Sequence, residues 1–375
     1  MFKIIHILLI ILFLLQGTNE YNVVILLLLI TLLVFCLAKR KTTLKMPSYL
    51  ALAIIFYSFY LLIGIVNFHD NPFIDIKFQL FSLIFFFLLI NFKFDILKVL
   101  FSINTLVFII YGLLFLDILP NIWHESTLGV GGRINGPSII VINLILFYYL
   151  ITEKPFDNRL IIASLMGFIC IALTTNFMNL AVFAILIFLQ VINFRKLLKP
   201  IYIITFVLIF LGAIWYLNSP YVPELVSAKM KYIYKPWEYG SLKTRIEDFN
   251  KAILSENFNI FKKIFGEGYG ASTSIYRENK IAPSLSRTFN FQEIDNGFYY
   301  LYHRGGWSLL FIFILSHLYL LLKLKGAKAK LGFISLIFVT NILSIHYFNY
   351  YFYLLIPFFI LYRGRILDMY KEYNP

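Results

Sequence analysis

The chain has 375 residues, of which 60% are hydrophobic and 14% charged, and its mean hydropathy is +0.81. A soluble domain of this composition would expose more apolar surface than it could bury, and the polar tracts of disordered chains are nearly absent, so both classes are excluded. The sequence therefore predicts an all-α polytopic membrane protein with lipid as its solvent.

The net charge of +14 does not indicate a nucleic-acid partner, because the basic residues recur in short clusters between apolar runs instead of forming one patch. The two cysteines, Cys36 and Cys170, both lie in apolar stretches, so neither a disulfide framework nor a thiolate metal site is expected. No P-loop or Asp-x-Asp motif is present. We expect no metal and no cofactor.

About twelve apolar stretches are candidates for transmembrane helices. They cover residues 2–16, 21–38, 48–66, 77–91, 97–116, 137–152, 159–175, 177–192, 200–217, 305–322, 330–345 and 348–362. Several are shorter than the roughly 20 residues of a full span, so interfacial or re-entrant segments are the alternative. The first stretch has the length of a signal peptide, but no small-residue cleavage site follows it, so we expect a retained helix.

The distribution of charge predicts the orientation. With a cytoplasmic amino terminus, the inner segments hold 19 basic and five acidic residues, and the outer segments hold 14 of each. This positive-inside pattern places both termini in the cytoplasm. The expected parts are an N-terminal bundle at 1–217, a long outer loop with short helices at 218–304, and C-terminal helices with a cytoplasmic tail at 305–375. A loop of this length is usually functional.

The shorter outer segment ends in a glycine-rich turn, GVGGRINGP, which contains Arg133 and Gly136. Pro137 is well suited to begin the next helix. Exposed backbone amides and a guanidinium beside a helix amino terminus match the oxygens of a phosphate or pyrophosphate. The alternative is an interfacial arginine that extends to water. These residues alone leave both interpretations open.

The long outer loop contains a predicted amphipathic helix, SLKTRIEDFNKAI, with Leu242, Ile246, Phe249 and Ile253 at helical spacing. Arg245 lies at one edge of that apolar face. Its simplest role is a local ion pair with Glu247 or Asp248 on a solvated helix. The following IFGEGYG is predicted to be a tight turn, since no strand precedes it and the glycine spacing differs from a dinucleotide fingerprint.

The last element of the loop, EIDNGFYYLYHRGGW, alternates aromatic and polar residues before a span. It directs Asp295, Asn296, His303 and Arg304 toward the outer mouth of the bundle. Asp295 is a candidate general base for an attacking hydroxyl, and the alternative is that Asp295 and Asn296 cap the next helix. The predicted spans carry no Asp or Glu near their centres, which disfavours an ion-coupled transporter.

Four short motifs, in this order, resemble the O-antigen polymerase and O-antigen ligase superfamily. They are GRINGP at 132–137, TRIEDFNKAI at 244–253, FGEGYG at 265–270 and DNGFYYLYHRGG at 295–306. Each is weak alone, and their order and spacing are more specific. Ligases usually have His at the start of the last motif, where this chain has Asp295, which favours a polymerase. TTNFMN stands where the family often has Ser-Arg, so one expected cation is absent.

The resemblance implies a GT-C-like fold in the bacterial inner membrane and a periplasmic long loop. It implies metal-independent transfer of glycans from undecaprenyl pyrophosphate, with Arg133, Arg245 and Asp295 as catalytic residues. Arg304, His303, Asn296 and Gly136 are the expected substrate-binding residues. The implied partners are the undecaprenyl-pyrophosphate-linked oligosaccharide, membrane lipid and a chain-length regulator protein.

Four alternatives remain at this stage. An O-antigen ligase is the nearest, followed by a lipid-monophosphate sugar transferase, which would require an acid in the first outer loop, where Glu20 stands alone. A lipid-linked oligosaccharide flippase is the rival from another class, and the long outer loop disfavours it. The fourth is a non-catalytic scaffold. The sequence does not distinguish between O-antigen, capsule and other polysaccharides as the product.

Overall fold

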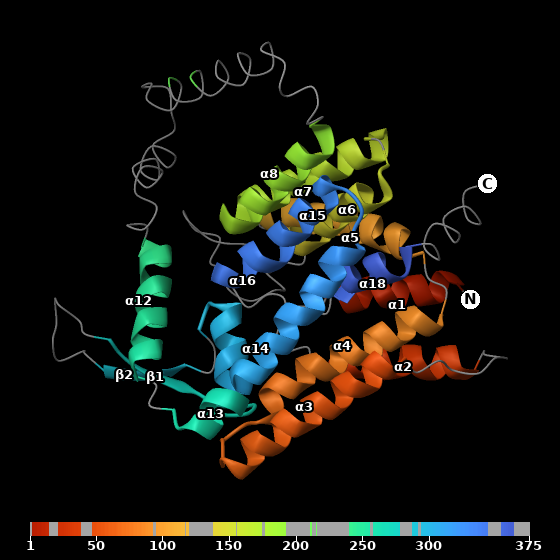
Figure 1. Ribbon diagram of the computed structural model, residues 1–375. Helices are drawn as coiled ribbons and strands as arrows, with labels where there is room; N and C mark the ends of the chain where they lie inside the picture. Colours follow the sequence, from red (N-terminus) through yellow and green to blue (C-terminus); the bar gives the residue numbers. More distant parts are fainter. Residues whose placement is uncertain are drawn as a thin grey trace. The chain divides into compact units, whose positions relative to one another are not determined.

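The computed structural model describes most of the predicted helical segments. It covers residues 2–14, 22–38, 47–92, 95–116, 118–119, 138–154, 156–174, 177–192, 211, 215, 240–255, 258–277, 287–291, 294–343 and 354–363. These residues are predominantly helical and include a two-stranded sheet (Figure 1). The chain divides into two compact units. The first comprises Met1–Gln190, Phe258–Ser272 and Asn296–Pro375, and the second comprises Val191–Asn257 and Thr273–Asp295.

Helices dominate the amino-terminal half of the chain. They are α1 (Phe2–Leu14), α2 (Asn22–Ala38), α3 (Ser48–Val66), α4 (Phe73–Asn91), α5 (Ile96–Phe115), α6 (Ser138–Thr152), α7 (Asn158–Thr174) and α8 (Phe177–Val191). Each lies within a few residues of a span predicted from hydropathy. The predicted span at 200–217 falls largely outside the described residues.

The carboxyl-terminal half contains both helices and strands. Its elements are α12 (Gly240–Ser255), α13 (Ile260–Phe265), β1 (Thr273–Arg277), β2 (Arg287–Phe291), α14 (Gly297–Lys323), α15 (Ala327–Ile334), the π-helical turn η4 (Ser335–Val339), α16 (Thr340–Leu343) and α18 (Leu355–Leu361). Helix α14 begins eight residues before the predicted span at 305–322, because the polar-aromatic stretch that precedes it is also helical.

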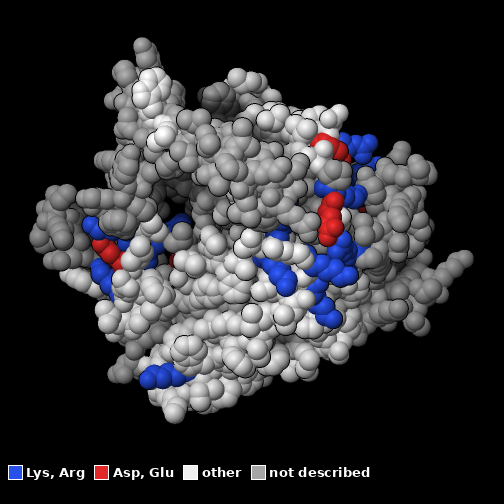
Figure 2. All heavy atoms as spheres, turned by 45° about the horizontal axis from the view of Figure 1, so that its top comes forward, with Lys and Arg blue, Asp and Glu red and all other residues white. Residues whose placement is uncertain are grey.

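Three helices among the described residues are long and apolar enough to cross a membrane: Ser48–Val66, Ile96–Leu114 and Gly297–Lys323. Several shorter apolar helices accompany them. The fold is therefore that of a mainly helical membrane protein. Figure 2 shows one face of the molecule, where charged side chains gather in small groups beside broad uncharged regions.

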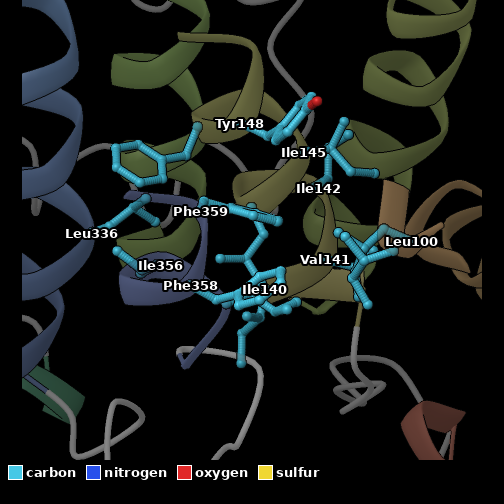
Figure 3. Packing of buried hydrophobic residues seen from close by; sticks show 14 of the residues in the cluster. Leu100, Ile140, Val141, Ile142, Ile145, Tyr148, Leu336, Ile356, Phe358 and Phe359 are labelled. Carbon is cyan, nitrogen blue, oxygen red and sulfur yellow. The ribbon is translucent and has the colours of Figure 1, made fainter. Parts of the chain in front are cut away.

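Helix α6 forms the centre of the first unit. Every residue from Ile140 to Ile151 is at most 5% exposed. A helix that is apolar on all sides is stable only when neighbours cover its whole circumference. Helices α5, α7, α15 and α18 all pack against it, and Figure 3 shows its side chains between Leu100 of α5, Leu336 of η4 and Phe359 of α18. The Tyr148 and Phe359 rings meet edge to face at 5.2 Å.

Helix α3 has the opposite character and lies at the edge of the first unit, where Ile55 is 63% exposed, Leu62 59% and Val66 70%. In water such an exposed apolar surface would promote aggregation, whereas in a bilayer the lipid chains cover it. The burial of α6 and the exposure of α3 thus distinguish the inside of the bundle from its lipid-facing surface.

Two hydrogen bonds join helix ends within the first unit. The Tyr49 hydroxyl at the start of α3 bonds to the Tyr362 hydroxyl after α18, and Gln190 near the end of α8 donates to the Lys154 carbonyl after α6. These bonds connect helices that are far apart in the sequence.

The second unit contains an element that the sequence did not predict. Strands β1 and β2 pair antiparallel, with Thr273 opposite Phe291 and Arg277 opposite Arg287, and α12 packs against β1. Lys251 of α12 donates to the Tyr276 carbonyl. The long loop was expected to contain short helices, and strands were not predicted in it. Each strand has only five residues, so the alternation of buried Thr273 and Ile275 with exposed Ser274 and Tyr276 is too short to identify a strand from the sequence.

The side chains of α12 differ in burial within the second unit. Ile246 and Ile253, which belong to the apolar face expected to rest on the bundle or the membrane, are 42% and 48% exposed. Ala252 is fully buried instead, and Arg245 and Phe249 are partly buried. The Arg245 side chain therefore lies toward the packed side of α12, where it contacts Asp295.

Candidate functional site

The glycine-rich motif FGEGYG forms a tight turn after α13, as predicted. Asn259 caps α13 by accepting from the Lys262 amide, and the chain then turns through Gly266, Gly268 and Gly270, all with positive φ. The turn lies directly on α3, since a Cβ on Gly268 would be 2.3 Å from the Gly64 amide nitrogen. Only glycine permits this backbone approach, which explains the glycine at this position.

Helix α14 breaks where the turn meets it. Gly306 has φ 59° and ψ −159°, so the helix is interrupted between its first segment, Gly297–Gly305, and the longer part that follows. The carbonyls of His303 and Arg304 accept hydrogen bonds from the Glu267 and Gly268 amides at 2.9 and 3.0 Å. The turn thus satisfies carbonyls that the break in the helix releases, as membrane-embedded backbone requires.

A buried carboxylate joins these elements. Asp75, in the first turn of α4, is 1% exposed. Its Oδ2 atom lies 2.7 Å from Arg304 Nε and accepts from the Gly270 amide at 2.7 Å, while Oδ1 accepts from the Tyr300 hydroxyl at 3.0 Å. Arg304 is also 1% exposed. Asp75 therefore connects α4, the glycine-rich turn and the first segment of α14.

The second partner of Arg304 is His303. Arg304 Nη1 lies 2.8 Å from His303 Nδ1. A guanidinium only donates, so Nδ1 accepts and the imidazole is neutral with its proton on Nε2. The ring of His303 stacks on Tyr299, with centroids 5.4 Å apart. The Arg304 charge is thus held between an anion and a neutral acceptor.

A second polar layer surrounds this buried group. The Glu267 carbonyl accepts from Asn67 Nδ2 at 2.8 Å and lies 2.9 Å from His69 Nε2. The Glu267 carboxylate bonds to Lys262 Nζ at 2.7 Å. Asn67 and His69 belong to the α3–α4 turn, which is thereby fixed to the glycine-rich turn.

Tyr269 occupies the interior of the same turn at 1% exposure. Burial raises its pKa well above the usual value, and the nearby Tyr57 and Asp75 side chains raise it further. The phenol therefore stays protonated at physiological pH. Its backbone amide donates to the Tyr60 carbonyl at 3.1 Å, which adds another bond between α3 and the turn.

Two of the predicted catalytic residues meet in the second unit. Arg245 Nε of α12 lies 2.9 Å from Asp295 Oδ2, although the residues are 50 positions apart in the chain. The Arg245 side chain is 32% exposed and that of Asp295 52%. The sequence had suggested Glu247 or Asp248 as partners for Arg245. Glu247 instead lies 3.9 Å from Lys243.

Asn296 fulfils the predicted capping role. Its Oδ1 atom accepts from the Tyr299 amide at 2.8 Å, and its Nδ2 atom donates to the Ile342 carbonyl at 3.0 Å. The cap of α14 is therefore made by Asn296, whereas the Asp295 carboxylate is directed to Arg245. Of the two roles considered for Asp295, helix capping is performed by Asn296.

Other predicted residues are placed less favourably for direct binding or are not described. Arg304 and His303, expected to bind substrate, are 1% and 4% exposed. Arg133 and Gly136 lie outside the described residues. Within the described part of the chain, no three His, Cys, Asp or Glu side chains are grouped so that they could hold a metal ion.

Asp75 was not singled out from the sequence. It belongs to NPFIDIKFQLF, where a single acidic residue follows a proline and is flanked by apolar residues. Asp75 lies two residues before the predicted span at 77–91, where an acid is favoured by the helix dipole and is easily taken for a capping group. Its partner at position 304 is 229 residues away, and no local pattern indicates that pairing.

These features define a mainly helical membrane protein with a buried ion-pair network in its first unit and an accessible ion pair in its second. Comparison with models of protein families and with curated proteins found no match to the chain.

The first prediction concerns the glycine-rich turn. Gly268→Ala should lower the free energy of unfolding by about 2 kcal/mol or more, since it adds both a strained φ and an overlap with Gly64. Gly112→Ala is the matched control, because nothing lies within 4 Å of its added Cβ. The measurement is unfolding of the purified protein by SDS titration. Equal midpoints for the two variants would contradict the packing described.

The second prediction concerns the buried ion pair. Asp75→Leu alone should lower the free energy of unfolding by about 3–5 kcal/mol, because it leaves Arg304 buried without its counter-ion. The double variant Asp75→Leu with Arg304→Met should be more stable than Asp75→Leu, by about 1 kcal/mol or more, since the unpaired charge is removed as well. A double-mutant cycle in SDS measures the coupling. Additive effects of the two substitutions would contradict a direct pair.

Proposed function

We propose that the chain is a membrane glycosyltransferase that polymerises undecaprenyl-pyrophosphate-linked oligosaccharide units into O-antigen or capsular polysaccharide at the outer face of the bacterial inner membrane. In this proposal both termini are cytoplasmic and the segment 218–304 is periplasmic. A growing chain is transferred from its lipid diphosphate to a hydroxyl of a new unit, without a metal ion.

One observation carries the proposal: motifs that are far apart in the sequence meet in pairs. Arg245 of TRIEDFNKAI contacts Asp295 of DNGFYYLYHRGG, and the amides of FGEGYG bond to the carbonyls of His303 and Arg304 in that last motif. The resemblance was based on the motifs and on their order and spacing in the sequence. Pairwise contact between them, the first within the second unit and the second within the first unit, is an independent observation that supports the proposal.

The exposed pair Arg245–Asp295 has the properties needed for the chemistry. An exposed ion pair contributes about 1 kcal/mol or less to stability, so an anionic ligand can displace it at low cost. A diphosphate would attract the guanidinium of Arg245 through charge and paired hydrogen bonds. The carboxylate of Asp295, once released, is available as a base beside the same ligand.

The proposed step is a displacement at the anomeric carbon of the donor sugar. The acceptor oxygen forms a bond to that carbon while the bond to the diphosphate oxygen breaks, and the diphosphate leaves with the electron pair. Asp295 receives the hydroxyl proton. Charge that develops on the leaving group is stabilised by Arg245 and by Arg133.

The remaining predicted residues have supporting roles in this proposal. Arg304 is paired with Asp75, so we assign it to the framework of the first unit and not to direct contact with the leaving group. His303 accepts from Arg304, and Asn296 fixes the start of α14. Gly136 gives the turn around Arg133 the freedom to approach a phosphate.

The prediction is tested by complementation of a strain that lacks this gene. Arg245→Ala, Arg133→Ala and Asp295→Asn should each reduce long-chain polysaccharide by at least tenfold on gels. Lys243→Ala is the matched control, since Lys243 lies on the same helix with a 62% exposed side chain and a single long contact to Glu247. Membrane levels of each variant are measured in parallel.

The deletion phenotype separates the alternatives. A polymerase leaves single repeat units attached to the lipid A core, whereas loss of single units as well indicates a ligase or a flippase. A normal ladder in the deletion strain would overturn the proposal. Normal polysaccharide ladders from all three variants would contradict the assignment of Arg245, Arg133 and Asp295 to the catalytic site.

A further inference from the structure

We propose that α13 and Phe68 form a membrane-interface anchor, which binds phospholipid at the boundary between the headgroups and the acyl chains. All residues of this anchor belong to the first unit. In Figure 1, α13 lies beside the turn that connects α3 to α4, and this turn contains Phe68. The anchoring role is separate from glycan transfer and does not depend on it.

Helix α13 has an apolar side and a basic side. At about 100° per residue, the four apolar residues of its sequence IFKKIF fall within an arc of about 140°, and the two lysines occupy the opposite side. Most of the apolar side is directed away from the protein, since Ile260 is 78% exposed, Phe261 54% and Ile264 43%. Six residues are too few to cross a bilayer, so α13 fits along its surface, with the lysines near the lipid phosphates.

Phe68 adopts a backbone conformation that a bulky residue disfavours. It follows the C-cap of α3 with φ 55°, at the position where helices usually place glycine. The His69 amide donates to the Gly64 carbonyl and the Phe68 amide to the Ile65 carbonyl, which is the hydrogen-bond pattern of a Schellman motif. The Phe68 side chain is 91% exposed, so packing within the protein does not offset the strain. Contact with lipid supplies the missing apolar environment.

Phe68 and α13 are held together by Glu267, which follows α13 in the glycine-rich turn. The residues on either side of Phe68, Asn67 and His69, lie 2.8 and 2.9 Å from the Glu267 carbonyl oxygen through their side-chain nitrogens. The Glu267 carboxylate bonds to Lys262 of α13 at 2.7 Å. The exposed phenyl ring and the exposed helix are therefore parts of one connected surface.

This surface continues the lipid-facing surface of α3. Phe265 of α13 packs edge to face on Phe59 of α3, with ring centroids 5.8 Å apart. The end of α13 lies directly on the break in α14, since a Cβ on Gly306 would be 2.5 Å from the Ile264 carbonyl oxygen. Trp307, the next residue of α14, is 59% exposed, and tryptophan is enriched where helices leave the acyl region. The continuity with α3 identifies the bilayer as the partner of α13.

The test measures the accessibility of spin labels in proteoliposomes made from equal amounts of phosphatidylethanolamine and phosphatidylglycerol. After both native cysteines are replaced by alanine, single labels are attached at Phe261→Cys, Phe68→Cys, Lys263→Cys or Ile55→Cys. Lys263 is on the basic side of α13, and Ile55 is a lipid-facing reference in α3. Oxygen concentrates in lipid and a charge-neutral nickel chelate in water, so the ratio of their collision rates with each label reports its surroundings.

The labels at Phe261→Cys and Phe68→Cys should give an oxygen-to-nickel ratio about fivefold or more above that at Lys263→Cys, and below that at Ile55→Cys. Ile260→Cys is a second site on the exposed apolar side, and it should give the same result as Phe261→Cys. The unfolding midpoint of each labelled variant in SDS is compared with that of the cysteine-free protein, and only variants with matching midpoints are used.

Two outcomes would overturn the proposal. Ratios at Phe261→Cys and Phe68→Cys equal to that at Lys263→Cys would place α13 in water. Protection of Phe261→Cys from both reagents would show that protein, either a second copy of the chain or another partner, covers this surface in place of lipid.

Discussion

The arrangement of the first unit depends on one buried interaction, the ion pair between Asp75 and Arg304. Removing two charges from water is costly unless each finds directional partners, and here the carboxylate also binds a backbone amide and a hydroxyl. These partners come from segments far apart in the chain, so the pair forms only when α4, the glycine-rich turn and α14 are all in place. The break at Gly306 is tolerated for the same reason, because the turn satisfies the carbonyls that the interrupted helix exposes.

Two of the ion pairs among the described residues, Asp75–Arg304 and Arg245–Asp295, differ in their exposure to solvent. The pair Asp75–Arg304 is almost completely buried, so opening it would leave an uncompensated charge. The pair Arg245–Asp295 is partly exposed and opens at little free-energy cost. Each side chain can therefore leave its partner and bind a substrate instead. In the proposed function the buried pair stabilises the first unit, and the partly exposed pair of the second unit performs the chemistry. Arg304 is then a structural residue, and Arg245 contacts the substrate.

The sequence predicted the helices well because hydropathy and length are local properties, and α3 and α6 coincide with their predicted spans to within a residue. It also singled out Arg245 and Asp295 separately. Their contact was not predicted, since no local pattern indicates that a side chain of α12 meets a residue 50 positions further along the chain. Asp75 and the β1–β2 hairpin were missed as well. The role of Asp75 depends on a partner 229 positions away, and two strands of five residues each are too short for a local pattern to identify.

The proposal that this chain transfers glycans from a lipid diphosphate is tested with the purified protein in proteoliposomes and a single lipid-linked repeat unit as substrate. We expect polymer growth with release of one undecaprenyl pyrophosphate for each linkage formed, without added nucleotide sugar and in the presence of a metal chelator. Failure of the folded wild-type protein to form polymer, or growth that requires a nucleotide sugar, would contradict it.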